Sequence, residues 1–304
     1  MSLANKKGVD ISSSNGNIDL AKVKKAGYEF VMIRCGYGSD MKSQDDSQFE
    51  ANVKKAEKLS MPWGVYIYSY ALNVNDAKSE VEHVKRCLKG KKPTLPIAFD
   101  MEDADGYKSK RGAMKKSLIT DICKTFLEGI KKAGYYPSLY CSKSWLDTYI
   151  DKSVYSKYDL WVAQWASSCT YKGSNLGMWQ YGGEVCYIES NSISGVGTID
   201  KDKCLKDYPT IIKNGGYNNW AKPTVKTLDT TGFKKGDKGN GVLALKQLLF
   251  IAKSKKLIDA KMNNDGGFGG ETQRAVNTLL KKFGYSQNGI AGEKFIKKLG
   301  EKLK

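Results

Sequence analysis

The chain has 304 residues, of which 40% are hydrophobic and 11% aromatic, and this length and composition argue against a largely disordered protein. No apolar stretch approaches the roughly 20 residues that a membrane-spanning helix needs, so we expect no membrane insertion. The net charge of +18 is uneven, because residues 221–304 contain 18 Lys and Arg against 7 Asp and Glu. Such a surface favours a polyanionic partner, either nucleic acid, an anionic membrane or an anionic cell-wall polymer.

The seven cysteines are widely spaced, odd in number and without a C-x-x-C pair, which favours free thiols over a disulfide framework or a zinc site. The single histidine, His83, lies in the lysine-rich stretch EVEHVKRCLKGK, and we expect it on the exposed face of a helix. A histidine-rich metal site is therefore excluded, and we predict neither a metal nor another cofactor. The first residues, MSLANKKGVDIS, contain no apolar segment before Gly8, so we also expect no secretory signal.

Short apolar runs recur along the first two thirds of the chain, and amphipathic helical stretches separate the early ones. The runs predict eight strands, at 8–12, 30–38, 62–71, 95–102, 135–142, 159–166, 178–183 and 195–202. The helical stretches are 17–26, 44–59, 75–89 and 112–133, and little room for helices remains between the last three runs. Alternating strands and helices imply parallel pairing, so residues 1–210 are predicted to form an α/β domain, a TIM-like (β/α)5(β)3 barrel.

Glycines and composition mark the ends of the helices and of the domains. The sequence KKAGY occurs at 24–28 and again at 131–135, where Gly27 and Gly134 are expected to end a helix. Periodicity is lost around NGGYNNWAKP, which predicts a linker over 211–230. Residues 231–304 then show three helical stretches, the first around Val242 to Ala252, the second from Glu271 and the third over GEKFIKKLGEKL, so we predict a small all-α three-helix domain.

The fourth apolar run ends in acid, in the stretch LPIAFDMEDADGY at 95–107. Side chains alternate along a strand, so Asp100 and Glu102 should face the barrel mouth, at the C-terminal rim where barrel enzymes place catalytic groups. Two neighbouring carboxylates disfavour simultaneous ionisation, so one should retain its proton as a general acid must. The alternative is an acidic loop that caps the next helix or binds a cation, with Asp103 and Asp105 as caps.

Other strands add acids and aromatic rings to the same mouth. Asp10 ends the first run and Asp200 the last, and these strands are neighbours if the barrel closes. Four carboxylates around one mouth favour glycoside cleavage. Rings near strand ends could stack on sugars or belong to the core; they are Tyr66, Tyr68, Tyr70, Trp165 and Trp179.

The order of these motifs resembles family 25 of the glycoside hydrolases, the Chalaropsis-type lysozymes of autolysins and phage endolysins. The resemblance covers about residues 6–205 and rests on GVDISSSNGNID, FVMIRCGYG, GVYIYSYA, LPIAFDMED, LYCS, LWVAQW, MWQY and ISGVGTIDKD. It implies an N-acetylmuramidase that cuts the β-1,4 bond between N-acetylmuramic acid and N-acetylglucosamine. It also implies roles for individual residues: Glu102 as proton donor, Asp100 as the acid that assists the substrate's acetamido group, Asp10 and Asp200 as further conserved acids, and Tyr66, Trp165 and Gln180 along the groove. The Asp202 of DKD departs from the family pattern, in which many members have Asn.

Residues 233–299 resemble the three-helix type of peptidoglycan-binding domain, through KKGDKGNGVLALKQLL, DGGFGGETQRAV and NGIAGEKF. Together the resemblances imply that peptidoglycan and anionic wall polymers are the partners and that nucleic acid is not. They also imply that the protein acts at the bacterial cell wall after release by a route without a signal peptide.

Two alternatives to this function stay open. One is a wall-binding protein on the same scaffold without catalysis, and the other is a nucleic-acid binder that uses the basic tail.

Overall fold

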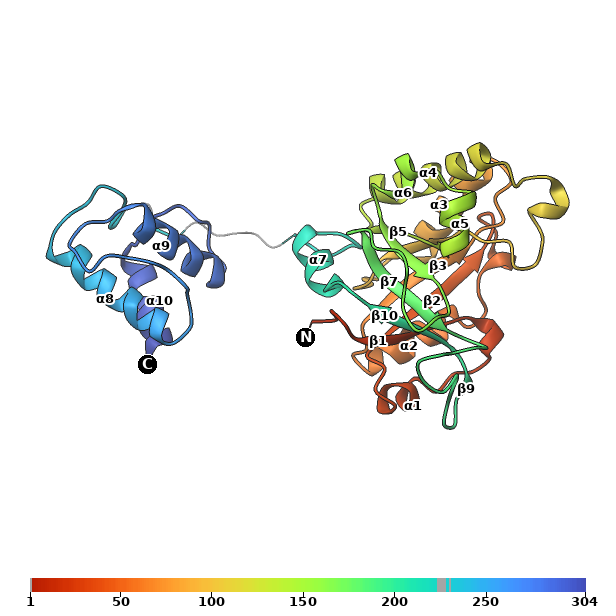
Figure 1. The fold of residues 1–304 in the computed structure, drawn as a ribbon, viewed down its shortest axis with the longest axis horizontal. Helices are drawn as coiled ribbons and strands as arrows, with labels where there is room; N and C mark the ends of the chain where they lie inside the picture. Colours follow the sequence, from red (N-terminus) through yellow and green to blue (C-terminus); the bar gives the residue numbers. More distant parts are fainter. Residues whose placement is uncertain (1, 223–227, 230) are drawn as a thin grey trace. The chain divides into compact units, whose positions relative to one another are not determined.

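The computed structural model describes residues 2–222, 228–229 and 231–304, and the chain divides into two compact units, Met1–Pro223 and Thr224–Lys304 (Figure 1). The expected linker, 211–230, falls partly within the first unit, and its residues 223–227 and 230 lie outside the described residues. Within the described ranges, no helix combines the length and the apolar character needed to cross a membrane.

The first unit is a closed eight-stranded barrel, as the sequence predicts. Its strands are β1 (Lys7–Ile11), β2 (Phe30–Tyr37), β3 (Trp63–Tyr68), β4 (Ile97–Asp100), β5 (Pro137–Ser142), β6 (Asp159–Ala163), β7 (Leu176–Gly182) and β10 (Asp200–Cys204). Their order around the barrel is β1-β10-β7-β6-β5-β4-β3-β2. The strands from β1 to β7 pair in parallel, whereas β10 is antiparallel to both of its neighbours, β1 and β7. Parallel pairing is therefore the wrong prediction for the last strand, because only the hairpin β8 (Ser192–Ile193) and β9 (Gly197–Thr198), and no returning helix, separates β7 from β10.

The helices that cover the barrel begin and end close to the predicted ranges. They are α1 (Leu20–Lys25), α2 (Phe49–Lys58), α3 (Val74–Cys87) and α4 (Lys116–Lys132). Gly27 and Gly134 follow α1 and α4 with φ of +94° and +85°, the conformation that favours glycine after a helix. The shorter elements are α5 (Lys143–Thr148), α6 (Lys152–Tyr155), α7 (Tyr208–Gly215) and the 3₁₀ turns η1 (Ser13–Asn15), η2 (Lys42–Gln44) and η3 (Ser109–Arg111).

The alternation of side chains along β4 divides two hydrophobic cores. Ile97 and Phe99 belong to the core between strands and helices, where Phe99 stacks on Phe126 of α4 at 4.0 Å between ring centroids. Ala98 faces the barrel interior, together with Phe30, Met32, Tyr66, Trp161 and Met178. The predicted alternation of side chains along this strand, with Ala98 facing the barrel interior and Ile97 and Phe99 facing the helices, is therefore confirmed. The expectation of an exposed His83 is wrong: it lies on the inner face of α3 and is fully buried.

The segment after α7 packs on the bottom of the barrel. Asn218 has φ of +55° and no exposed surface. Its side-chain oxygen accepts a hydrogen bond from the backbone N–H of Tyr136 at 2.9 Å, and its amide donates to the carbonyls of Leu95 at 2.9 Å and Pro93 at 3.3 Å. One side chain thus ties together the segments that lead into β4 and β5.

The second unit contains three helices, α8 (Asn240–Ser254), α9 (Gly270–Lys282) and α10 (Glu293–Leu303), as predicted. They enclose a separate hydrophobic core that includes Val242, Leu245, Leu249, Val276, Leu279, Phe295 and Leu299. The unit therefore has the independent core that a small domain needs.

We predict that Asn218→Ala lowers the free energy of unfolding of the barrel by about 2 kcal/mol, because it leaves buried backbone groups without partners. Urea unfolding followed by tryptophan fluorescence measures this, since all six tryptophans lie between residues 63 and 220 and report on the barrel alone. Asn214→Ala, at an exposed position of α7, is the control. Equal stability of the two variants would contradict the assignment of this segment to the barrel.

Candidate active site

The predicted acids meet at the rim where the parallel strands end. Asp100 is the last residue of β4, and Asp10 lies opposite Asp200 in the register of β1 and β10. Asp200 was expected to end its strand but begins it. Because β10 runs antiparallel, its first residue reaches the same rim as the last residues of the parallel strands. The placement at the mouth therefore arises from a strand direction that the sequence did not reveal.

Asp100 and Glu102 form a coupled pair of carboxyls. Asp100 is only 4% exposed, while Glu102 is partly exposed. Burial, and then the charge of Glu102, raise the pKa of Asp100 well above its ordinary value. Burial also raises the pKa of Glu102, while a hydrogen bond with Asp100 opposes the rise. The pair can therefore share one proton, and the deeper Asp100 is the stronger holder in the free protein.

Gln180 joins a second acid to two aromatic rings. Its amide nitrogen donates to Oδ2 of Asp10 at 2.9 Å, and its amide oxygen accepts from Tyr140 Oη and Trp165 Nε1, both at 3.1 Å. These three bonds fix the orientation of the amide. Burial raises the pKa of Asp10, and the nearby Asp200 and Asp202 raise it further.

Asp202, which the family pattern placed in doubt, lies inside the barrel beneath the mouth. It is fully buried and accepts a hydrogen bond from Trp161 Nε1 at 2.7 Å. Burial raises its pKa to about 8, and burial with the charge of Glu102 raises the pKa of Asp200 to about 6. Sequence reasoning left this residue outside the site, although its spacing of two from Asp200 places both on one face of a strand.

The predicted aromatic residues divide between the mouth and the core. Tyr66 lies inside the barrel with its ring 5.9 Å from that of Trp161, Tyr68 pairs with Asp100 across β3 and β4, and Trp165 is 38% exposed. Trp179 does not join them. It points from β7 to the side opposite Gln180, packs beside Tyr181 and donates from Nε1 to the carbonyl of Gln164 at 2.8 Å.

The loop after Glu102 contains the two acids that the alternative interpretation named as helix caps, but neither caps α4, whose N-cap residue is Lys115 without a side-chain cap. Asp103 accepts hydrogen bonds from the backbone N–H groups of Lys108 at 2.6 Å and Ser109 at 3.0 Å. Asp105 accepts from the N–H of Tyr107 at 3.0 Å and from Tyr70 Oη at 2.7 Å. The four acids of this stretch therefore separate into two at the mouth and two that shape the loop.

Lys108 is a fully buried residue that sequence reasoning missed. Its ammonium group donates to the backbone carbonyl of Ser69 and, at 3.1 Å, to that of Glu102. Beneath it, the buried Glu80 accepts from Ser69 Oγ at 3.0 Å and from the N–H of Tyr70 at 2.8 Å. The loop with Glu102 is thus fixed to the loop after β3 from below. A single lysine in a lysine-rich sequence carries no signal of this role.

A polar cleft of about 680 Å³ opens beside Glu102. Its walls come from β5, the start of α5 and the segment after β6, and include Tyr140, Ser142, Lys143, Gln164, Trp165 and Gln180. The cleft therefore combines one acid of the coupled pair with an exposed indole ring and several hydrogen-bonding groups.

One cluster elsewhere in the described residues has ligand types that suit a metal, namely Asp45, His83 and Cys87, whose ligand atoms lie within 4.8 Å of one another. The side chains of Asp45 and His83 already make hydrogen bonds with other protein groups. Both carboxylate oxygens of Asp45 accept from Arg86, at 2.7 and 2.9 Å, and His83 lies between the Gly38 carbonyl at 3.0 Å and Asp45 at 2.9 Å. We interpret it as an ion-pair network that joins α3 to the loop after β2.

A barrel with paired carboxyls at its mouth is an arrangement that glycoside hydrolases use. The sequence profile of the glycosyl hydrolases family 25 matches residues 9–189, and the chain belongs to this family. Lysozyme M1 of Streptomyces globisporus is 26% identical over 208 residues, 64% of this chain and 66% of the relative. The autolytic lysozyme of Clostridium acetobutylicum is 25% identical over 198 residues, 65% and 55% respectively. The chain thus spans less than two thirds of either bacterial relative.

Solved structures share the barrel. The modular autolysin LytC of Streptococcus pneumoniae, solved in complex with a synthetic peptidoglycan ligand, has a TM-score of 0.56 and 26% identity, over 65% of this chain and 46% of LytC. A family 25 glycosyl hydrolase of Bacillus anthracis has a TM-score of 0.54 and 22% identity, over 73% of this chain and 95% of that protein.

We predict that Asp202→Asn makes the barrel more stable relative to the parent as pH rises. A carboxyl whose pKa is raised to about 8 on folding contributes stability below its unfolded pKa near 4, and that contribution is lost as pH rises towards 8. The asparagine still accepts from Trp161 but cannot ionise. Urea unfolding between pH 4 and 8 should show a difference that grows by about 1 kcal/mol per pH unit.

The exposed Asp121 on α4 provides the control, since Asp121→Asn removes one negative charge from the surface. A stability difference for Asp202→Asn that does not change across this pH range would show that Asp202 does not titrate inside the barrel.

Proposed function

We propose that this protein is a peptidoglycan hydrolase, an N-acetylmuramidase that cleaves the β-1,4 bond between N-acetylmuramic acid and N-acetylglucosamine. The observation that carries the proposal is the coupled pair of Asp100 and Glu102 beside an open polar cleft, in a barrel of glycosyl hydrolases family 25. The names of its relatives support it, because two are lysozymes and a third, from Arthroderma benhamiae, is an N,O-diacetylmuramidase with 28% identity over 180 residues.

In this proposal, Glu102 donates its proton to the glycosidic oxygen as the bond from that oxygen to C1 breaks. The 2-acetamido oxygen of the muramic acid attacks C1, and Asp100 orients and stabilises the acetamido group. Glu102, now ionised, then accepts a proton from the water that attacks C1 and releases the product. Asp10 and Asp200 complete the mouth as acids that bind the glycan.

The shared proton explains how Glu102 could act as an acid although Asp100 holds the proton more strongly in the free protein. A glycan that covers the partly exposed Glu102 removes water from it and raises its pKa further. Because the charge of Glu102 raises the pKa of Asp100, a rise in the pKa of Glu102 would shift the shared proton from Asp100 to Glu102. Substrate binding would then prepare the acid as well as position the bond.

The aromatic and polar groups of the cleft suit a sugar chain. Trp165 offers an exposed ring for a sugar face, while its Nε1 is held by Gln180. Tyr68 pairs with Asp100 across β3 and β4, Gln180 donates to Asp10, and the charges of Asp10 and Asp100 reach Tyr66. In this proposal Tyr66, Tyr68 and Gln180 contact the sugar at the cleavage point. Trp179 is omitted from this set because its side chain lies in the core.

We assign wall binding to the second unit. It has three helices and a surplus of lysines, with 17 Lys and Arg against 7 Asp and Glu in residues 224–304. Positive charge attracts anionic wall polymers, and the attraction weakens with salt. The protein would therefore act at the bacterial cell wall, with peptidoglycan as its substrate and partner.

We expect Glu102→Gln to lower the rate of peptidoglycan cleavage by about 100- to 10,000-fold, because glutamine cannot donate the proton. The release of new reducing ends from purified peptidoglycan measures it. Glu128→Gln, on the surface of α4, is the matched control and should cleave at the parental rate. A parent protein that sediments with cell walls but releases no reducing ends would favour a non-catalytic wall binder.

We expect Lys108→Met to reduce kcat by about 10- to 100-fold, because the carbonyl of Glu102 loses the donor that positions its loop. Burial raises the pKa of Asp100 and Glu102 and the Lys108 charge opposes that rise, so its loss should shift the alkaline limb of the pH–rate profile to higher pH. Lys110→Met, at an exposed neighbour, should change neither quantity.

Lys108→Arg keeps the positive charge and should restore the position of the alkaline limb even where kcat stays low. A Lys108→Met protein with the parental pH profile and a reduced stability alone would show a purely structural role.

A further inference from the structure

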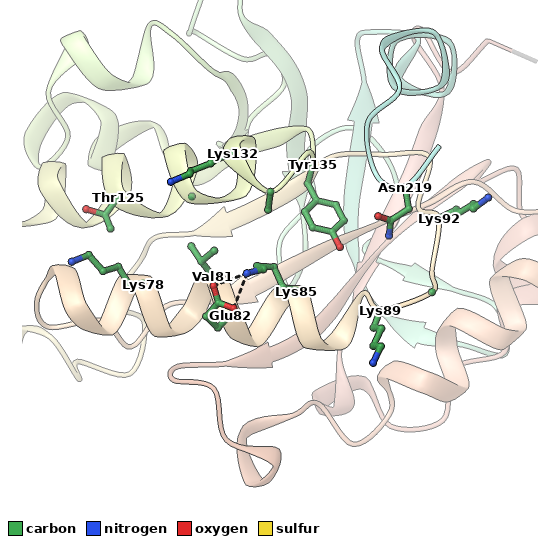
Figure 2. Close-up of a pocket in the computed structure, with 13 residues that line it drawn as sticks. Lys78, Val81, Glu82, Lys85, Lys89, Lys92, Thr125, Lys132, Tyr135 and Asn219 are labelled. Carbon is green, nitrogen blue, oxygen red and sulfur yellow. Dashed lines mark hydrogen bonds and ion pairs between the residues drawn. The ribbon is translucent and has the colours of Figure 1, made fainter. Parts of the chain in front are cut away.

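A second hollow lies on the outside of the barrel, between α3 and α4. It has a volume of about 740 Å³ and ends at the loop after α3, beside Tyr135 and Asn219 (Figure 2). Its lining contains none of the residues at the mouth. We call it the lysine groove, after the five lysines that line it: Lys78, Lys85, Lys89, Lys92 and Lys132.

The positive charge of the lysine groove is largely unpaired. Glu82 is the single acid in the lining, and it pairs with Lys85 at 2.7 Å. Lys78, Lys89, Lys92 and Lys132 are exposed and have no carboxylate within 4.0 Å in the described parts of the chain. Four lysines without an acidic partner among the described residues therefore line the groove, and Figure 2 shows Lys89 and Lys92 extending outward from its rim, where Lys92 Nζ lies 5.7 Å from the centre of the Trp220 ring.

Helix dipoles account for only part of this charge. The C-terminal ends of α3 and α4 each carry about half a negative charge, which offsets roughly one of the four lysines. The remaining charges repel one another across a shared hollow, and an anion in the groove would relieve that repulsion. The lysine groove thus carries a surplus of positive charge that a polyanion would complement.

The array is long rather than compact. Lys78 and Lys89 are eleven positions apart along α3 and its end, a span of about 16 Å at the rise of an α-helix. One phosphate could contact only one end of such an array. A chain that carries a charge at regular intervals could contact all of it.

The floor of the groove offers no surface on which nucleic-acid bases could stack. Tyr135 is its one aromatic residue and is only 6% exposed, and Val81 is equally buried. Gly129 lets α4 approach α3 closely, since a Cβ there would lie 2.8 Å from a methyl group of Val81. Binders of single-stranded nucleic acid combine basic charge with exposed rings, and this groove has only the charge.

We propose that the lysine groove binds a linear polymer of polyols joined by phosphodiesters, the chemistry of an anionic wall polymer. The expectation that the protein meets such a polymer at the cell wall rests on the proposed function. The expectation that the groove binds the polymer rests only on the charge and length of the groove. The groove holds the barrel on polymer-bearing walls, in addition to any contact that the second unit makes.

The test compares two full-length triple variants that remove the same charge. The first is Lys78→Gln, Lys89→Gln and Lys132→Gln, within the groove. The control is Lys25→Gln, Lys54→Gln and Lys58→Gln, at exposed lysines of α1 and α2 without a carboxylate partner among the described residues. Binding to purified poly(glycerol phosphate) is measured over a range of salt concentrations.

We expect the groove variant to bind about 10-fold more weakly or worse at low salt, with a salt dependence that falls by about two to three released ions. The control variant should change affinity by less than about 3-fold. Equal weakening in both variants, or parental affinity in the groove variant, would overturn the proposal. A loss of single-stranded oligonucleotide binding with unchanged poly(glycerol phosphate) binding would identify a nucleic-acid site instead.

Cleavage of peptidoglycan stripped of anionic polymer separates this proposal from the proposed function. Parent, groove variant and control should cleave it at the same rate. A parent that binds poly(glycerol phosphate) through the groove but cleaves nothing would contradict the enzyme and leave the groove supported.

Discussion

The pairing of β10 between β1 and β7 is the constraint on which the rest of the site depends. It closes the barrel, and its antiparallel direction brings Asp200 opposite Asp10 and Asp202 opposite both Gly8 and Gln180. A parallel last strand would turn these acids to the other end of the barrel. The hydrogen bond from Gln180 to Asp10 then spans from β7 to β1 across the inserted strand, so backbone pairing and side-chain bonding fix the same arrangement.

This arrangement costs stability, and the cost is a property of the site. Asp10, Asp100 and Asp202 are all nearly or fully buried, and burial raises the pKa of each. A buried carboxyl remains protonated at a pH at which a free one has ionised, which is the state that a proton donor needs. The same burial makes ionisation unfavourable to folding. The large apolar core outside the strands, together with contacts such as those of Asn218, offsets that cost.

The sequence predicts the part of this structure that depends on periodicity. Eight apolar runs, four amphipathic helices and the parity of Ala98, Asp100 and Glu102 follow from spacing alone, because strands and helices repeat their environment at fixed intervals. The direction of β10 was not predicted, because alternation of strands and helices implied parallel pairing throughout, whereas the connection from β7 to β10 contains a hairpin and no returning helix. Trp179 shows a second limit: its position near a strand end suggested the mouth, but it points to the face of β7 opposite its neighbour Gln180, and the face that lines the barrel interior is set by the pairing of β7 with β6 and β10.

Buried charge is the other feature that spacing does not reveal. His83 and Lys108 look like surface residues because their neighbours are charged, yet both are fully buried against partners distant in the sequence: Asp45 and Gly38 for His83, and Ser69 for Lys108. A charged side chain is buried only where the fold supplies hydrogen-bond partners, so its burial is a consequence of the tertiary structure.

Positive and negative charges are then separated within one barrel. Each helix returns from the mouth, so the C-terminal ends of α3 and α4, with Lys85, Lys89 and Lys132, lie at the end of the barrel away from the acids. At physiological salt the field of an exposed charge decays over about 8 Å, so anionic groups bound at Lys89 and Lys132 would act mainly on that end of the barrel. The proposed polymer site and the proposed proton donor thus differ in their surroundings, because the groove carries exposed positive charge whereas the mouth carries buried carboxyls.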